Sequence, residues 1–214
     1  MATRKSGRQR RNNASRPSVF LNLPYDPGFE TLFLAYLAGV SALGMSPRAA
    51  LEIPGSARRL ERIYDLMSTC PYSIHDLSRV QLDRTKPATP RFNMPFELGL
   101  AVARGIFNAN HKWFVFEAMQ HRITKSLSDL NGTDVYIHAA TISGVFAQLG
   151  NAFLRTGPQP TISQYRAIYR SLRSSVPTVL KETGSRTVFE ARPFQALSAV
   201  AVGLTTRIVL THGQ

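Results

Sequence analysis

Glu97 has the clearest potential for chemistry in this sequence, because of its place in a helical pattern. It lies four positions after Asn93 and two before Gly99, so Asn93 and Glu97 would share one helix face near the helix start. Free N–H groups and the dipole there favour an ionised carboxylate, which in a cleft could act as a nucleophile or stabilise positive charge on a sugar ring. The alternative is that Glu97 only complements the helix dipole.

Asp76 is the second candidate carboxylate. It ends a β-prone run and could orient a ribose hydroxyl, as acids do in dinucleotide-binding folds, or cap the turn that contains Ser78. If both acids serve one active site, the carboxylates of Asp76 and Glu97 lie within about 10 Å on the same side of the sheet. His75 alternates with Asp76 along the strand and points to the opposite face, where we expect it to be packed or hydrogen-bonded.

Short apolar runs that alternate with helical patterns must position these side chains. The β-prone runs are residues 19–23, 48–53, 72–77, 113–118 and 135–138, and the helical patterns are residues 29–43, 57–67, 94–107 and 123–130. Ser56 and Asn93 are expected to cap the second and third helices. The alternation predicts βαβ crossovers, and therefore a parallel sheet covered by helices on both faces.

The first strand is expected to be central in this sheet. Open parallel sheets bind ligands beyond the carboxyl ends of their strands, at the point where the strand order reverses. The strand residues that we expect to be buried are Phe20, Ile74, Val115 and Ile137.

The strand–helix alternation fades beyond Thr141. Residues 142–154 and 163–180 look helical, Pro177 marks a kink or an end in the second, and residues 188–210 are ambiguous between strand and helix. The chain is therefore divided into a tail (1–17), an α/β domain (18–140) and a mainly helical extension packed on or beside it (141–214).

Positive charge is concentrated in the N-terminal tail. The chain of 214 residues has a formal net charge of +13, and residues 1–17 hold Arg4, Lys5, Arg8, Arg10, Arg11 and Arg16 with no acid. With almost no apolar surface to bury, the tail is expected to be disordered. It would make a loose electrostatic contact with nucleic acid or an acidic partner, or serve only as a solubilising leader.

Several classes of protein are not supported. There is no G-x-x-x-x-G-K loop and no G-x-G-x-x-G after the first strand, and the five histidines lack the spacing of a structural zinc site. A lone cysteine, Cys70, excludes an intramolecular disulfide and fits a reducing compartment. Without an 18-residue apolar run or a secretory leader, the chain is expected to be cytoplasmic and to have no contact with a membrane.

Two blocks of the sequence resemble a known superfamily. Residues 76–78 (DLS) and 91–101 (RFNMPFELGLA) are similar to the D-L-[ST] and N-P-N-V-x-Y-E-L-G-x-A segments of proteins related to nucleoside 2-deoxyribosyltransferases and bacterial TIR domains. The resemblance covers Val19 to about His138 and includes residues 128–134 (SDLNGTD). The chain departs from the pattern in a longer loop at residues 78–90, in Asn-Met-Pro for Asn-Pro-Asn, and in a first-strand motif at residues 22–26 that is only loosely similar.

The resemblance implies a flavodoxin-like three-layer fold, with a central parallel five-stranded sheet, and cleavage of N-glycosidic bonds in nucleosides or NAD. Glu97 matches the catalytic glutamate of the E-L-G segment, and Asp76 matches the acid after the third strand of the transferases. Asn22 and Asp76 would hold ribose hydroxyls, and Tyr25 or Phe92 would stack on a base. The full set of expected substrate-binding residues is Asn22, Tyr25, Asp26, Ser78, Phe92 and Asn93.

The leading hypothesis is a nucleotide-binding N-glycosidase, an NAD glycohydrolase of bacterial antiviral defence or stress signalling. No cofactor or metal is required, because nicotinamide leaves from a cationic pyridinium; NAD or a nucleoside would be the substrate. The alternative is a non-catalytic nucleotide-sensing or scaffold subunit of a defence complex. The expected partners are a nucleotide, a second copy of the chain or a defence-complex subunit, and nucleic acid at the tail.

Overall fold

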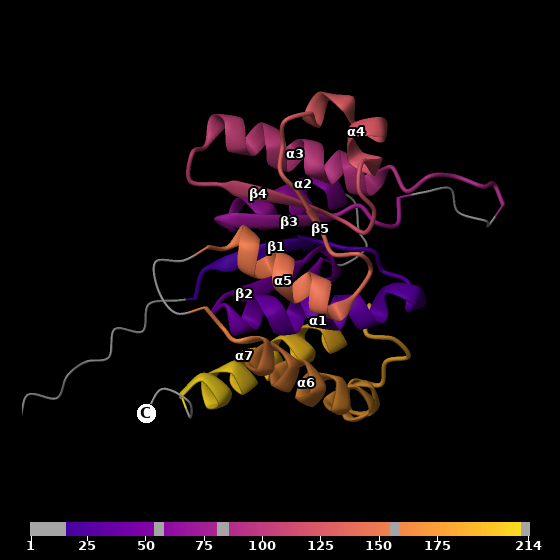
Figure 1. Ribbon diagram of the computed structural model, residues 1–214. Helices are drawn as coiled ribbons and strands as arrows, with labels where there is room; N and C mark the ends of the chain where they lie inside the picture. The colour runs from indigo at the N-terminus through magenta and orange to yellow at the C-terminus, as the bar shows by residue number, and fades with distance from the viewer. Residues whose placement is uncertain (1–15, 54–57, 81–85, 155–158, 211–214) are drawn as a thin grey trace, which may run out of the picture.

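An all-parallel sheet of five strands forms the middle of the protein (Figure 1). The computed structural model describes residues 16–53, 58–80, 86–154 and 159–210. The strands are β1 (Ser18–Asn22), β2 (Ser46–Ala49), β3 (Tyr72–Asp76), β4 (Lys112–Glu117) and β5 (Val135–Ile137). Their order, β2-β1-β3-β4-β5, is that of flavodoxin-like folds and reverses between β1 and β3. The predicted α/β fold is therefore confirmed.

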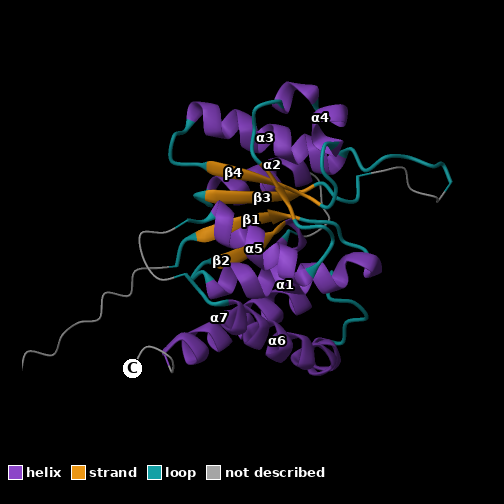
Figure 2. Ribbon diagram, viewed as in Figure 1, coloured by secondary structure: helices purple, strands orange, loops and turns teal. Residues whose placement is uncertain are grey.

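Helices cover both faces of the sheet, as Figure 2 shows by element type. One face carries α1 (Glu30–Ala42) and α5 (Ile142–Ala152). The other carries α2 (Arg59–Ser68), α3 (Asn93–Phe107) and α4 (Arg122–Ser126). Two long helices, α6 (Ile162–Thr183) and α7 (Ala191–Leu210), pack against the outer side of α1 (Figure 1). Three short 3-10 helices span Pro27–Phe29, Ala50–Glu52 and Ser128–Leu130.

The helix α1 is buried on every side. All eleven residues from Leu32 to Ala42 are buried, which is expected of a helix that is apolar all round. The sheet covers one side of α1, and α6 and α7 cover the other, where Leu172 and Phe194 join the same hydrophobic core. The C-terminal helices are therefore a fourth layer that α1 requires, and they share its core.

The structure corrects several element boundaries. The second strand ends at Ala49, and the expected strand residues 50–52 form a 3-10 helix instead. β3 is the central strand rather than β1, and Ile137 is only partly buried in the edge strand β5. Pro177 neither ends nor interrupts α6, because it lies on the exposed side, where the carbonyl that loses its helical partner can bond to water.

Two expectations concern residues outside the described ranges: the cap at Ser56 and the state of tail residues 1–15. Within the described ranges, no helix combines the length and the apolar character needed to cross a membrane.

Two glycines of α5 offer a direct test of how tightly its first turn is packed. A Cβ at Gly144 would lie 2.0 Å from the backbone oxygen of His138, whereas a Cβ at Gly150 would meet nothing within 4 Å. Gly144→Ala should lower the free energy of unfolding by roughly 2 kcal/mol or more, because backbone must move. Gly150→Ala should raise it by up to about 1 kcal/mol, through helix propensity. Urea denaturation measures both, and equal effects would contradict this packing.

Candidate functional site

A cavity of about 570 Å³ opens beyond the carboxyl ends of β1 and β2, between α2 and α3. This is the switch point between β1 and β3, where doubly wound sheets bind ligands, and its volume suits a nucleotide-sized molecule. Its lining residues are Asn22, Leu23, Pro24, Tyr25, Ala50, Arg59, Leu60, Ile63, Arg91, Asn93, Met94, Phe96 and Glu97.

Among the described residues that line this cavity, Glu97 is the only acid. Its side chain is largely removed from water, with 7% of the residue exposed. Burial raises the pKa of Glu97 to about 7, against the opposing effect of the Arg59 charge. The carboxylate therefore changes its charge near neutral pH.

We predicted that the free N–H groups and the dipole at the start of the helix favour the ionised form of Glu97, and this prediction is wrong. The first residue of α3 is Asn93 itself, the capping position falls on Phe92, and no side chain bonds the free N–H groups there. Glu97 is consequently the fifth residue of α3, beyond the first turn, where the dipole acts most strongly. Desolvation decides its pKa instead.

Arg59 and Tyr25 approach Glu97 from two other elements. Arg59 donates hydrogen bonds to the backbone oxygens of Ile53 and Ala50, at 2.8 and 3.3 Å, which ties α2 to the end of β2. Burial, followed by the nearby Glu97 charge, raises the pKa of Tyr25 well above its usual value, so the phenol stays protonated.

The hydroxyl of Tyr25 lies near Glu97, Arg59 and the backbone of Ala50, which also line the cavity. Its ring packs against Phe33 and Phe189, with ring centroids 6.3 and 6.1 Å apart. A face of Tyr25 is therefore less open to a ligand base than the ring of Phe96, which lines the cavity and is 54% exposed.

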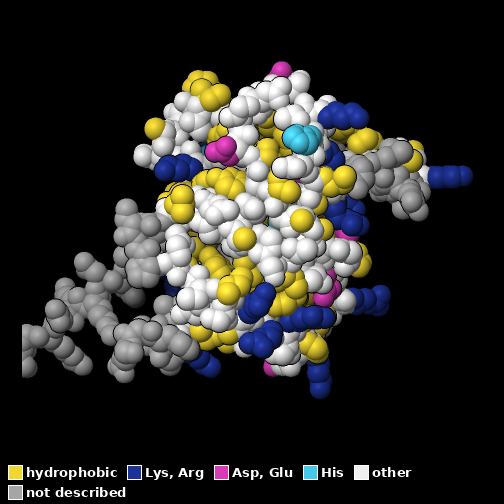
Figure 3. Space-filling model, in the orientation of Figure 1, with side chains coloured by type: hydrophobic (Ala, Val, Ile, Leu, Met, Phe, Trp, Pro, Cys, Tyr) yellow, Lys and Arg dark blue, Asp and Glu magenta, His cyan; other side chains and the backbone are white. Residues whose placement is uncertain are grey.

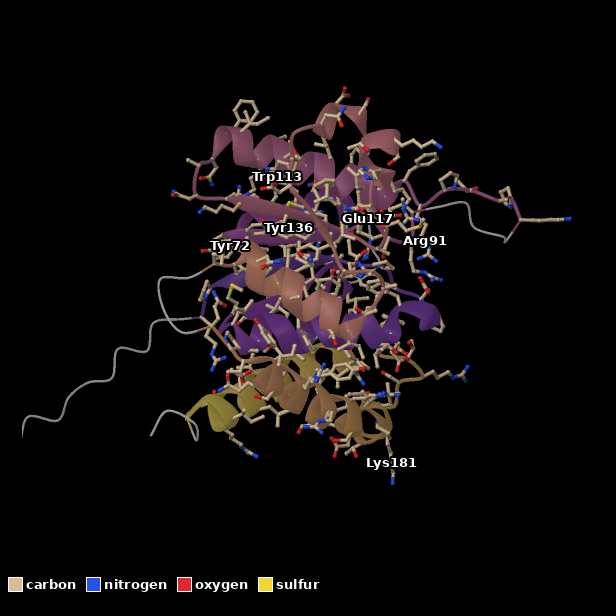
Figure 4. All side chains as sticks on the ribbon, in the orientation of Figure 1. Tyr72, Arg91, Trp113, Glu117, Tyr136 and Lys181 are labelled. Atoms are coloured by element: carbon tan, nitrogen blue, oxygen red, sulfur yellow. The ribbon has the colours of Figure 1, made fainter. Side chains whose placement is uncertain are left out.

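Asp26 holds two arginines that face different hollows. Its Oδ2 lies 2.9 Å from Arg91, which lines the cavity, and its Oδ1 lies 3.1 Å from Arg79. Arg79 borders a second hollow of about 310 Å³, which also involves Ser78. Figure 4 shows Arg91 at the same end of the sheet as Glu117, with Tyr72 at the opposite end. Asp26 thus orients Arg91 rather than lining the cavity itself.

Asp76 lies on the other face of the sheet, so the prediction that it shares a side with Glu97 is wrong. Its Oδ2 accepts a hydrogen bond of 2.8 Å from the hydroxyl of Tyr36 in α1, and its Oδ1 accepts one of 2.9 Å from the N–H of Ser78. Successive strand residues alternate between faces, and His75 takes the side of the cavity. Asp76 is fully buried and does not line the cavity.

His138 completes the surroundings of Asp76. The N–H of Ala140 donates to His138 Nδ1 at 3.1 Å, which leaves the ring hydrogen on Nε2. That Nε2 lies 3.1 Å from Asp76 Oδ2. The second predicted carboxylate therefore belongs to a closed structural cluster with Tyr36 and His138. Glu117, a third buried acid, is likewise held by Arg122 and by the N–H of Ala118.

The cavity brings together about half of the residues predicted for the site. Asn22, Tyr25, Asn93 and Glu97 line it, whereas Asp76, Ser78 and Phe92 do not. Sequence reasoning missed Arg59, Arg91 and Phe96. Phe96 carried a usable signal, its place beside Glu97 at the start of the helix. Arg91 begins the block 91–101 that resembles the superfamily, whereas Arg59 carried no signal among 26 lysines and arginines.

In comparisons with known proteins, no family model, no curated protein and no solved structure matches the chain. Within the described ranges, no group of three or more His, Cys, Asp or Glu residues is arranged to hold a metal ion. The cavity and its residues are therefore the basis for a proposal of function.

The raised pKa of Glu97 predicts how its replacement changes stability with pH. Between its ordinary pKa and about 7 the folded protein binds more protons than the unfolded chain, so stability falls as pH rises through this window. Glu97→Gln removes this loss, and should gain roughly 2–3 kcal/mol relative to wild type between pH 5 and pH 8. Urea denaturation at several pH values measures the gain. Glu61→Gln, an exposed change on α2, is the control, and a flat difference between Glu97→Gln and wild type would contradict the burial of the Glu97 carboxylate.

Proposed function

We propose that the protein is a nucleotide-binding N-glycosidase that hydrolyses the nicotinamide–ribose bond of NAD. The observation that carries the proposal is a buried carboxylate, Glu97, which is the one acid among the described residues that line a nucleotide-sized cavity at the switch point of the sheet. Its role in bacterial defence or stress signalling, and any defence-complex partner, rest on the sequence resemblance alone.

The single carboxylate favours a substrate whose leaving group needs no proton. Most glycosidases pair a catalytic carboxylate with a second carboxyl group that protonates the leaving atom. Glu97 has no such partner among the residues lining the cavity, because Asp76 faces α1. Nicotinamide departs from a cationic pyridinium as a neutral molecule, so NAD fits this site better than a nucleoside with a neutral base.

The reaction would depend on the ionised form of Glu97. When the bond between ribose C1′ and the pyridinium nitrogen breaks, its electron pair stays on nicotinamide and C1′ becomes oxocarbenium-like. The carboxylate of Glu97 stabilises this centre or traps it covalently, and water then adds to C1′ and loses a proton. Arg59 supports the ionised form of Glu97 through its charge.

The remaining lining residues suit the other parts of a nucleotide. Arg59 and Arg91 supply guanidinium groups that recognise phosphate oxygens. Phe96 offers an exposed ring for stacking on a base, and the Tyr25 hydroxyl and the Asn93 amide offer polar contacts.

Release of nicotinamide from NAD by the purified protein tests the proposal. Glu97→Gln should lower kcat by at least about 100-fold while the Kd for NAD changes little, because the amide keeps the shape but not the charge. Glu61→Gln, on the exposed face of α2, is the matched control and should retain full activity. If wild type binds NAD without cleaving it, a nucleotide-sensing or scaffold role replaces the enzymatic one.

The pH dependence of kcat/KM gives a second prediction. Because the ionised carboxylate is the active form, kcat/KM should rise with pH and level off above the Glu97 pKa of about 7. A profile that falls through this range would assign Glu97 the role of a proton donor instead.

A further inference from the structure

A chain of buried hydrogen bonds runs along β3 on the face that carries α2 and α3. It begins at the cavity with Asn22, which the sheet register pairs with His75, and it ends near the amino end of β3. Its four side chains are at most 4% exposed. The groups in order are Met94 O, Asn22, His75, Ser73, His111 and Cys70 O, separated by 2.9, 3.1, 3.0, 3.1 and 2.9 Å.

The cavity end of this chain determines the orientation of the Asn22 amide. A backbone carbonyl only accepts, so the group 2.9 Å from Met94 O must be the amide nitrogen Nδ2. The same Nδ2 lies 3.1 Å from His75 Nδ1, which must then accept, and the ring hydrogen of neutral His75 is on Nε2.

The same reasoning carries to the far end. His75 Nε2 donates to Ser73 Oγ, and the Ser73 hydroxyl donates to His111 Nε2. The hydrogen of His111 is therefore on Nδ1, which donates to the backbone oxygen of Cys70. Burial lowers the pKa of His75 to about 3 and also lowers that of His111, so both rings are neutral at pH 7.

Both amide hydrogens of Asn22 are donated to acceptors within the protein, one to Met94 O and one to His75 Nδ1. Its carbonyl oxygen Oδ1 makes no hydrogen bond with the described residues, and Asn22 lines the cavity. The amide therefore meets a ligand only as a hydrogen-bond acceptor, and it cannot flip without placing Oδ1 against Met94 O.

We propose that Asn22 is a specificity-determining residue, whose Oδ1 selects ligands that carry a hydroxyl or N–H donor at this point, such as a ribose hydroxyl. His75, Ser73 and His111 are positioning residues that hold its orientation from outside the cavity. The identity of the ligand as a ribonucleotide rests on the proposed function, whereas the direction of the hydrogen bonds does not.

Nitrogen NMR of the two imidazole rings tests the direction of the chain in the full-length protein without a ligand. His75 should carry its hydrogen on Nε2 and His111 on Nδ1, and the His75 ring should not titrate between pH 5 and 8. The reverse tautomer at either ring, or a titration of His75 in this range, would overturn the positioning role.

Calorimetry with adenosine 5′-monophosphate and its 2′-deoxy and 3′-deoxy analogues tests the selection. One analogue should bind about tenfold more weakly to wild type, because an acceptor in the site is left without its donor. Ser73→Ala breaks the chain outside the cavity and should reduce this difference to within about threefold, and Ser73→Thr, which keeps the hydroxyl, should restore it. Ser41→Ala removes a fully buried hydroxyl of α1 and is the matched control.

The outcomes separate this inference from the proposed function. Equal binding of all three nucleotides to wild type would overturn the selection by Asn22. Unchanged discrimination in Ser73→Ala would overturn the positioning role of the chain. Neither result bears on NAD cleavage, which has its own assay. If none of the three nucleotides binds, the selection of ribose by Asn22 is overturned. The NMR measurement of the His75 and His111 tautomers then tests the positioning role by itself.

A second inference comes from the outer surface of α6. Four exposed cations occupy one stripe at helical spacing, Arg166, Arg170, Arg173 and Lys181, over about 22 Å of helix. None of them belongs to an ion pair among the described residues, and α6 carries a single acid, Glu182. Figure 3 shows Lys and Arg side chains gathered over this layer, and Figure 4 shows Lys181 pointing away from the protein.

The described chain begins beside this layer. Arg16, the first described residue, donates a hydrogen bond of 2.7 Å to Thr206 in α7, the helix that packs against α6. We infer that the α6 stripe binds the phosphate backbone of duplex nucleic acid without sequence selection.

Anisotropy of a labelled 20-base-pair DNA duplex, measured between 50 and 200 mM salt, tests this surface. Replacing Arg166, Arg170 and Arg173 by Gln should weaken binding and reduce the slope of log K against log salt by about 2 to 3. Replacing the exposed Lys86, Lys112 and Lys125 by Gln removes the same charge elsewhere and should change the slope far less. Equal losses of DNA affinity in the two triple variants would overturn the inference. So would a result in which the α6 variant loses affinity for phosphatidylserine vesicles but not for the DNA duplex.

Discussion

The burial of α1 on all sides is the constraint on which the rest of the structure depends. A helix without a polar face cannot lie against solvent, so the sheet must cover it on one side and α6 and α7 on the other. The C-terminal helices are thereby part of the core. The only phenol of α1, Tyr36, is carried into the interior with the helix, and its hydroxyl requires a partner there.

That partner is Asp76, and this hydrogen bond affects which carboxylates reach the candidate site. Because Tyr36 and His138 hold Asp76 on the α1 face, the carboxylate at the end of the central strand is not available to the cavity. Of the described residues that line the cavity, Glu97 is then the one acid, and burial raises its pKa to about 7. A site of this kind suits chemistry in which one carboxylate faces a developing cation and no second proton donor is needed.

The two faces of β3 divide the polar groups of the protein. Toward α1, Tyr72, Ile74 and Asp76 build an apolar core with one structural carboxylate. Toward α2 and α3, Ser73 and His75 form the buried hydrogen-bond chain that reaches Asn22 at the cavity. Every donor in this chain has a partner, so it stabilises one orientation of the amide rather than leaving a costly unsatisfied group in the interior.

The sequence by itself determined the parallel sheet, the positions of most helices and the place of Glu97 in the first half of the helix that follows β3, because strand and helix periodicity are local properties. It also determined that His75 and Asp76 point to opposite faces. Only the tertiary structure decided which face holds the cavity, since that depends on the packing of α1 and α3. The sequence could not show that Arg59 and Arg91 line the cavity, or that the pKa of Glu97 is raised to about 7. Desolvation and the proximity of charges arise only when distant segments of the chain meet.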